Sequence, residues 1–215
     1  MIATFLDSEA KTAIDIGCNE GALAIALAKC GLQVVGIEKD ARAREIAILL
    51  AHQMRMDVLF EDRQLTVDDL EAMEDVDVAL LLSVHHQLVA NFGLEYANSF
   101  LRALARRTRV QLFFQPACIL RKYKKPMPFE NNDVLAIIKY FDDLLADIFE
   151  HRALIGYSMN DVPRREPLRP MMLFSHRPIE PNDGRDVIGI IKEIKSARRV
   201  THPLVRQFFS RRMRT

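Results

Sequence analysis

The sequence predicts an α/β protein in which a mostly parallel sheet of seven strands carries helices on both faces. In the first half of the chain, short apolar runs alternate with amphipathic stretches, which is typical of strands joined by crossover helices. The run VDVALLLS at 76–83 is almost continuously apolar, as expected of a strand buried on both faces. The last two apolar runs are joined by a Pro- and Arg-rich loop, so we expect them to pair antiparallel at the sheet edge.

Apolar periodicity places the first five strands and the helices between them. Strands are expected at 12–16, 32–37, 57–60, 76–83 and 109–115. Helices are expected at 21–30, 41–54, 67–73 and 88–106, the first of them burying Leu23, Ala26, Leu27 and Cys30 on one face. Parallel strands joined in this way have right-handed crossovers.

The second half of the chain departs from this alternation. Asn131 is a suitable N-cap for a long helix that extends to about Glu150. Strands are expected at 153–158 and 171–175. Residues 1–178 then form one domain, and 179–215 form a basic helical C-terminal extension with a helix at 186–197.

Composition is that of an ordinary globular protein, with 49% hydrophobic and 27% charged residues and a net charge of +1. The N-terminus has no signal-peptide pattern, and no apolar run is long enough for a membrane span. The three cysteines lack a C-x-x-C spacing and no histidines cluster with them. These features predict a reduced, cytoplasmic protein without a metal site.

The near-neutral total hides a charge asymmetry. Residues 192–215 carry eight Lys or Arg and one Glu, a charge of about +7, so the remainder carries about −6. Within this tail Leu204, Val205, Phe208 and Phe209 have helical spacing among arginines. Such a basic amphipathic helix can dock on its own domain, a membrane surface, a protein partner or RNA.

The segment AIDIGCNEG at 13–21 lies where the first strand passes into the first helix. In open α/β sheets, ligands bind outside the carboxyl ends of strands. Gly17 permits a tight turn and close approach of the backbone to a ligand, and Gly21 lets the helix start close to the strand. Asp15 can accept from loop N–H groups or, through water, from an ammonium.

Glu38 follows the second strand, about 20 residues after the glycine loop. A carboxylate at this place can accept from both hydroxyls of a ribose. Dinucleotide-binding loops have the spacing G-x-G-x-x-G, whereas Gly17 and Gly21 are spaced G-x-x-x-G with Asn19 between them. The pattern therefore favours a nucleoside ligand with an amino-acid end.

At these residues the chain resembles the class I, Rossmann-like S-adenosylmethionine-dependent methyltransferases. Asp15, Gly17 and Gly21 match the first motif of that family, with Asn19 where a glycine is common; Asn tolerates positive φ better than most residues. The resemblance implies S-adenosylmethionine as cofactor, with Glu38 on its ribose and Asp62 on its adenine, Glu61 being the rival. The cofactor-binding candidates are Asp15, Gly17, Cys18, Asn19, Gly21, Glu38, Lys39, Asp62 and Ser83, and Cys18 is also explained as a small filler of the loop.

The fourth strand ends at Ser83-Val84-His85-His86, where the family keeps substrate and cofactor contacts. His86 and His85 are the catalytic candidates, since a histidine near pKa 6.5 can take a proton from an acceptor hydroxyl or amine. The alternative is that one histidine packs in the core or caps the next helix. Methyl transfer needs little acid–base help, because the sulfonium is already activated.

The expected function is methyl transfer to a small molecule or to an anionic glycan or lipid intermediate. Anion recognition is an alternative to simple solvation for the basic loop RKYKK at 121–125, and Gly156-Tyr157-Ser158 and Arg164-Arg165 are further rim candidates. Two other functions remain open. The chain could be an RNA methyltransferase that uses the basic tail, or a non-catalytic methyltransferase-like module that binds a partner protein.

Overall fold

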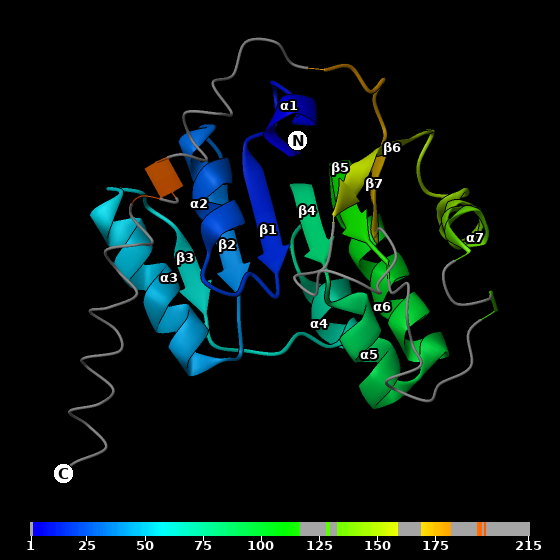
Figure 1. The fold of residues 1–215 in the computed structure, drawn as a ribbon, viewed down its shortest axis with the longest axis horizontal. Coiled ribbons are helices and arrows are strands. Elements are labelled where there is room, and N and C mark those ends of the chain that lie inside the picture. Colours follow the sequence, from blue (N-terminus) through cyan, green and yellow to red (C-terminus); the bar gives the residue numbers. More distant parts are fainter. Residues whose placement is uncertain are drawn as a thin grey trace.

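A single seven-stranded sheet forms the centre of the molecule (Figure 1). The computed structural model describes residues 2–116, 128–129, 133–158, 169–181, 193, 194 and 196. The strands are β1 (Thr12–Ile16), β2 (Gln33–Ile37), β3 (Leu59–Glu61), β4 (Val76–Leu82), β5 (Thr108–Gln115), β6 (His151–Ser158) and β7 (Arg169–Ser175), in the spatial order β3-β2-β1-β4-β5-β7-β6. Strands β1 to β5 are parallel, and β7 runs antiparallel to both β5 and β6. The predicted mostly parallel sheet with an antiparallel edge is confirmed.

Helices cover both faces of the sheet, because successive residues of each strand point to opposite sides. The helices are α1 (Ile2–Phe5), α2 (Ala22–Lys29), α3 (Ala41–Gln53), α4 (Val67–Ala72), α5 (His85–Phe92), α6 (Leu94–Arg106) and α7 (Val134–Leu145). In β4, Val78 and Leu80 pack with α1 and α2, whereas Ala79 and Leu81 pack with α4 to α7. The order of the strands reverses between β1 and β4, so the carboxyl edge at this point offers a ligand site.

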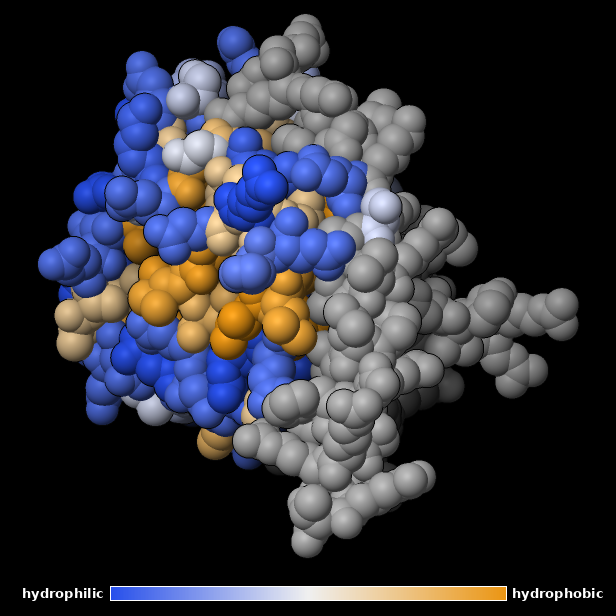
Figure 2. Space-filling view, turned by 90° about the vertical axis from the view of Figure 1, so that its left-hand side faces the viewer, coloured by the Kyte–Doolittle hydropathy of each residue, from blue (hydrophilic) through white to orange (hydrophobic). Residues whose placement is uncertain are grey.

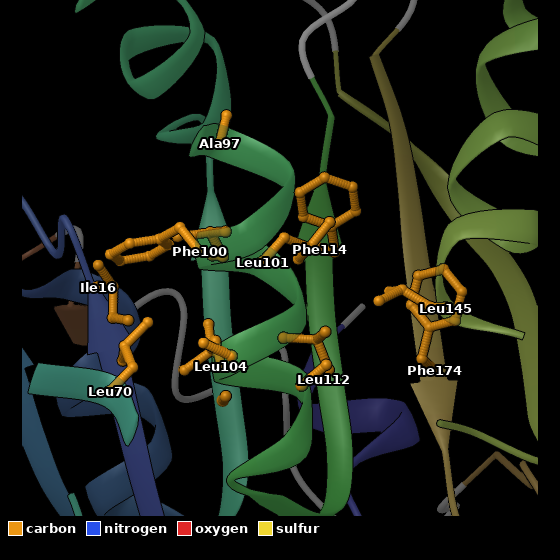
Figure 3. Close-up of a cluster of buried hydrophobic side chains, with 14 of the residues drawn as sticks. Ile16, Leu70, Ala97, Phe100, Leu101, Leu104, Leu112, Phe114, Leu145 and Phe174 are labelled. Atoms are coloured by element: carbon orange, nitrogen blue, oxygen red, sulfur yellow. The ribbon is translucent and has the colours of Figure 1, made fainter. Parts of the chain in front are cut away.

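Helix α6 contributes to the largest of the buried hydrophobic clusters in the described part of the chain. Figure 3 shows Phe100, Leu101 and Leu104 of this helix directed onto the sheet, where Leu112 and Phe114 of β5 meet them. All five side chains are fully or almost fully buried. Burial of a side chain of this size is worth about 1.5–3 kcal/mol.

Two helices differ from the sequence prediction. The helix expected at 88–106 is two helices, α5 and α6, separated at Gly93. Gly93 has φ 92° and ψ 168°, a conformation that is essentially limited to glycine and that ends one helix and redirects the chain into the next. Asp133, not Asn131, caps α7 by accepting a hydrogen bond from the Ala136 amide, and that helix ends at Leu145.

The N-terminal helix α1 was not predicted. Its Ile2 and the following Leu6 pack in the core on the α2 face of the sheet. The backbone N–H of Asp7 donates to Oε1 of Gln111, and the Gln111 amide nitrogen donates to the carbonyl of Phe5. These two bonds hold the N-terminal segment against β5.

The side of the molecule formed by β3 and α3 carries a hydrophobic patch (Figure 2). Leu59 of this edge strand and Ile48 and Leu49 of α3 are its large exposed apolar side chains. Near this side, Ile194 is buried against Ile25 of α2 and Leu50 of α3. No helix among the described residues is both long and apolar enough to cross a membrane.

Candidate functional site

The glycine loop between β1 and α2 folds through three residues with positive φ. Gly17, Asn19 and Gly21 have φ values of 71°, 51° and 74°. Asn19 therefore adopts a positive φ, which asparagine is expected to tolerate. The backbone N–H groups of Gly17 and Cys18 both donate to the Ile37 carbonyl, at 2.8 and 3.1 Å, which ties the loop to the end of β2.

Close packing also requires a glycine at positions 17 and 21 of this loop. A Cβ on Gly17 would lie 2.4 Å from Cγ2 of Val84, and a Cβ on Gly21 would lie 2.8 Å from Ala47 and Phe60. Gly17 thus brings the loop against the segment after β4. Gly21 brings the start of α2 against α3 and β3, whereas the sequence predicted only a close approach of the helix to the preceding strand.

Asp15 is a buried acid at the floor of this loop, with 3% of its surface exposed. Burial raises the pKa of its carboxyl from 3.8 to about 7, a hydrogen bond from the Ala24 backbone opposes the rise, and the charge of Glu38 adds to it. Its Oδ2 atom is buried without a hydrogen-bond partner among the described residues. A buried oxygen in this state is suited to a cationic donor such as an ammonium.

Glu38 lies at the carboxyl end of β2, where the two oxygens of its side chain accept from different parts of the chain. Oε2 accepts from the Asn19 backbone N–H at 2.9 Å, and Oε1 accepts from the Asp40 N–H at 2.8 Å. A carboxylate has about four acceptor positions, so both oxygens retain capacity for hydroxyl donors. The two backbone bonds fix the carboxylate in place beside the glycine loop.

A cavity of about 630 Å³ opens over these residues at the carboxyl edge of the sheet. This volume is sufficient for a nucleoside-sized ligand. The cavity is lined by the glycine loop and its flanking residues, by the segments that follow β2, β3 and β4, by part of α5 and by one residue of α6. The lining residues are Asp15, Ile16, Gly17, Cys18, Asn19, Glu20, Ala22, Leu23, Ile37, Glu38, Lys39, Asp40, Arg63, Gln64, Leu65, Leu82, Ser83, Val84, Gln87, Leu88, Asn91, Phe92 and Phe100.

The cavity brings together most of the predicted cofactor-binding residues. Those that line it are Asp15, Gly17, Cys18, Asn19, Glu38, Lys39 and Ser83. Gly21 acts through packing and does not line it. Burial raises the pKa of the Cys18 thiol well above its usual range, so this side chain is a neutral filler of the loop.

The predicted adenine-side acid Asp62 does not line the cavity. It forms an ion pair with Arg44 at 2.7 Å, and Arg44 also donates to the Glu38 carbonyl. Its rival Glu61 pairs with Arg63 at 2.9 Å. The segment after β3 borders the cavity through the next three residues instead, and Lys39 reaches one of them, Gln64, at 3.4 Å.

His85 is a core residue, so the expectation that it faces the rim is wrong. It is fully buried, with its ring edge-on to Phe114 and Phe141 at centroid distances of 5.6 and 5.1 Å. Burial lowers the pKa of the imidazole to about 4, and the neighbouring Asn98 side chain opposes this only in part. The ring is therefore neutral and packs between aromatic side chains.

His86 is half-buried in the first turn of α5 and does not line the cavity. Sequence reasoning placed both histidines after β4, where the helix begins at His85, but neither histidine is among the residues that line the cavity. The α5 residues that do line the cavity are Gln87, Leu88, Asn91 and Phe92. The i, i+4 spacing of these residues places them on one face of the helix. The sequence prediction began this helix at residue 88 and so did not identify that face.

Ser83 lies at the centre of a polar cluster that the sequence did not indicate. It has φ 58°, its hydroxyl donates to Oε1 of Gln115 at 2.5 Å, and it accepts from Nη1 of Arg169 at 3.2 Å. The three side chains come from the end of β4, the end of β5 and the start of β7. These ends meet at the carboxyl edge because β7 is antiparallel to β5.

Several predicted rim residues lie outside the described residues. These are the basic loop at 121–125, the pair Arg164-Arg165 and the tail at 198–215. Gly156 and Tyr157 lie in β6, in register with Met171 and Pro170 of β7. They do not line the cavity.

Comparison with known proteins agrees with this geometry. A family model described as a methyltransferase domain matches residues 14–111. Two curated relatives are ubiquinone biosynthesis O-methyltransferases. That of Alkalilimnicola ehrlichii is 37% identical over 29% of this chain and 24% of its own length, and that of Pseudomonas paraeruginosa is 30% identical over 48% of each. The chain thus spans about half or less of the length of the curated relatives it matches.

Solved structures share the fold. The bifunctional kinase-methyltransferase WbdD superposes with a TM-score of 0.60 and 24% identity, over 80% of this chain and 36% of that one. Magnesium protoporphyrin IX methyltransferase from Synechocystis PCC 6803, crystallised with bound S-adenosylmethionine, has a TM-score of 0.54 and 19% identity, over 79% and 72% of the two chains. The predicted resemblance to class I S-adenosylmethionine-dependent methyltransferases is confirmed.

Proposed function

We propose that this chain, whose fold is that of the class I S-adenosylmethionine-dependent methyltransferases, binds S-adenosylmethionine in the cavity beside Asp15 and transfers its methyl group to a small molecule. The observation that carries the proposal is that one nucleoside-sized cavity contains both the fixed Glu38 carboxylate and a buried Asp15 oxygen for which the described residues offer no hydrogen-bond partner. The relatives and the shared fold support the same assignment.

The residues present fit this cofactor. The Asp15 carboxylate would hold the ammonium of its amino-acid end, and Glu38 would hold the ribose hydroxyls. The missing Cβ of Gly17 keeps the loop close to the segment after β4, and Leu65, Gln64 and Lys39 border the remaining space for the base. When bound, S-adenosylmethionine supplies an electrophilic methyl group on a positively charged sulfur.

The protein's part in such a reaction is chiefly alignment and exclusion of water. The loop and the end of β4 hold the donor from two sides, and the buried side chains of Leu65, Leu88 and Phe100 close the cavity from the core. No histidine lines the cavity among the described residues. No histidine in the described part of the chain is therefore placed to take the proton that a hydroxyl acceptor releases on methylation.

For the acceptor, we propose a hydroxyl oxygen, because both curated relatives are named O-methyltransferases. The acceptor is a small molecule or an anionic glycan or lipid intermediate. The described cysteines Cys18 and Cys30 are free thiols, which supports the cytoplasmic location that we propose. The RNA alternative depends on a tail outside the described residues and is not part of this proposal.

Calorimetric titration with S-adenosylmethionine and S-adenosylhomocysteine tests the proposal. The wild-type protein should bind both. Glu38→Ala should weaken binding at least tenfold, because two hydrogen bonds to a charged acceptor are lost. Glu74→Ala is the matched control, since Glu74 is exposed before β4 and should leave the affinity unchanged.

Absence of binding to both ligands would contradict the proposed function. Binding that survives Glu38→Ala at full strength would contradict the ribose assignment alone. A methyl-acceptor screen with labelled S-adenosylmethionine on cell fractions then identifies the acceptor.

A further inference from the structure

Arg169 is not exposed, unlike Arg42, Arg55 and Arg106, and it also differs from most of the other arginines that the structure describes. Seven of them make an ion pair with a carboxylate: Arg44, Arg63, Arg102, Arg107, Arg109, Arg152 and Arg177. Arg169 is half-buried, and within the described part of the chain its hydrogen-bond partner is the neutral Ser83 hydroxyl. A guanidinium has five N–H donors in a planar fork, so most of its capacity remains for another group.

The geometry points to a function for this side chain. We propose that Arg169, oriented by Ser83, binds an anionic group, a carboxylate or a phosphate, of the methyl acceptor. This inference rests on the proposed function, since it assigns the acceptor side of the same site. It names a residue and a ligand chemistry that the cofactor-binding loop does not explain.

Ser83 connects this arginine to the cavity. The Ser83 hydroxyl donates its single proton to Gln115. Its lone pairs are therefore left to accept from Arg169. Ser83 adopts φ 58°, which is a strained conformation for a non-glycine residue. Ser83 lines the cavity, whereas Gln115 and Arg169 are not among its lining residues, so the hydroxyl holds the guanidinium beside the cavity wall, near the ends of β5 and β7.

The position suits an acceptor more than the donor. Asp15 and Glu38 lie on β1 and β2, whereas Ser83, Gln115 and Arg169 lie on β4, β5 and β7, on the other side of the point where strand order reverses. The cavity also exposes Leu23 and Phe92, which give apolar contacts to the body of a ligand. An acceptor with an apolar or aromatic body and one anionic group matches both features.

Binding of three matched probes tests the inference. Benzoate, phenyl phosphate and neutral benzyl alcohol are titrated by NMR, at low salt, into the full chain saturated with S-adenosylhomocysteine. We expect at least one of the two anions to bind at least tenfold more tightly than benzyl alcohol. The stronger anion distinguishes a carboxylate subsite from a phosphate subsite.

Variants assign the effect to this residue. Arg169→Gln should weaken anion binding at least tenfold and leave benzyl alcohol unchanged, and Arg169→Lys should retain part of the affinity because it keeps the charge but loses the fork. Ser83→Ala should cause a smaller loss. Arg106→Gln is the control: it removes the same charge from the exposed end of α6, before the amino end of β5, and should have no effect.

Equal affinities of the wild-type protein for the anions and for benzyl alcohol would overturn the inference. Anion binding that is the same in Arg169→Gln and the wild type would overturn it as well. The affinity for S-adenosylhomocysteine is measured separately in every variant and should not depend on Arg169. If that ligand fails to bind, the proposed function fails, and the anion titration without it still decides whether Arg169 is an anion site.

Discussion

At the scale of single residues, Asp15 and Glu38 are two acids of one site in different surroundings. Asp15 is buried, and its pKa rises to about 7 because the fold removes it from water. Glu38 is half-buried and accepts two backbone hydrogen bonds. The charge of Asp15 therefore changes near neutral pH, because the fold buries this carboxyl.

Asp15→Asn should stabilise the free protein and weaken its binding of cofactor. The pKa of Asp15 is about 7 in the folded chain and 3.8 as its reference value. The folded state thus holds this proton more tightly, and stability rises as pH falls from about 7 towards about 4. At pH 8 the neutral Asn should raise the free energy of unfolding by roughly 2–4 kcal/mol in urea titrations, and at pH 4 the difference should disappear.

Cofactor affinity gives the matching readout. Only ionised Asp15 attracts an ammonium, so calorimetry should show roughly tenfold weaker S-adenosylmethionine binding at pH 6 than at pH 8. In Asp15→Asn the affinity should be low and should not change in this way. Identical pH profiles for the two proteins would show that Asp15 does not contact the ammonium.

At the scale of elements, α2 shows how far periodicity can predict a buried face. The sequence predicted Leu23, Ala26, Leu27 and Cys30 as that face, but the buried residues are Ala24, Ile25 and Leu27. Leu23 lines the cavity instead. The helix is apolar on nearly every side, so its own pattern does not distinguish the sheet side from the ligand side.

Gly93 is the residue that makes α5 and α6 separate helices. Its surroundings are open, with no atom within 4 Å of an added Cβ, so a substitution there tests the backbone conformation alone. Gly93→Ala should lower the free energy of unfolding by about 1–3 kcal/mol, measured in urea. Ser99→Ala, at an exposed position of α6, is the control and should change stability by less than about 0.5 kcal/mol. Equal stability of Gly93→Ala and the wild type would mean that one continuous helix is an accessible alternative.

At the scale of the whole molecule, the described residues near the C-terminus contact the domain. Ile194 is 6% exposed among Ile25, Leu50 and Met54, and Glu193 forms an ion pair with Lys29 at 2.6 Å. The boundary at residue 178 and a separate helical extension remain predictions, as does contact of the tail with RNA or protein. Within the basic segment at 192–215, contact with the domain is observed at these two positions.

Replacing Ile194 tests how much this contact stabilises the fold. Ile194→Ala should lower the free energy of unfolding by about 2 kcal/mol or more, because it removes a buried side chain from the cluster between α2 and α3. Ile48→Ala serves as the matched control on α3, since Ile48 is 48% exposed. Urea unfolding measures both. A loss no larger at Ile194 than at Ile48 would contradict a stabilising role for this contact.

The sequence by itself determined the local features of this protein. Alternating apolar runs predicted the seven strands and the antiparallel edge, and the spacing of Gly17, Gly21 and Glu38 indicated the place of the cavity in which we propose that a nucleoside ligand binds. These features depend on neighbours in the chain: a positive φ at Asn19, a turn at Gly17 and the start of a helix at Gly21 are properties of a few consecutive residues. They could be predicted because chain neighbours alone decide them.

Only the tertiary structure decided which side chains share a surface. His85 and His86 are adjacent in sequence, yet one packs between Phe114 and Phe141 and neither lines the cavity. The contacts of Ser83 join residues 32 and 86 positions away along the chain, and Asp62 pairs with Arg44 rather than lining the cavity. Such pairings depend on strand order and on the rotation of each helix against the sheet. These are set by packing of the whole core, and no local pattern in the sequence specifies them.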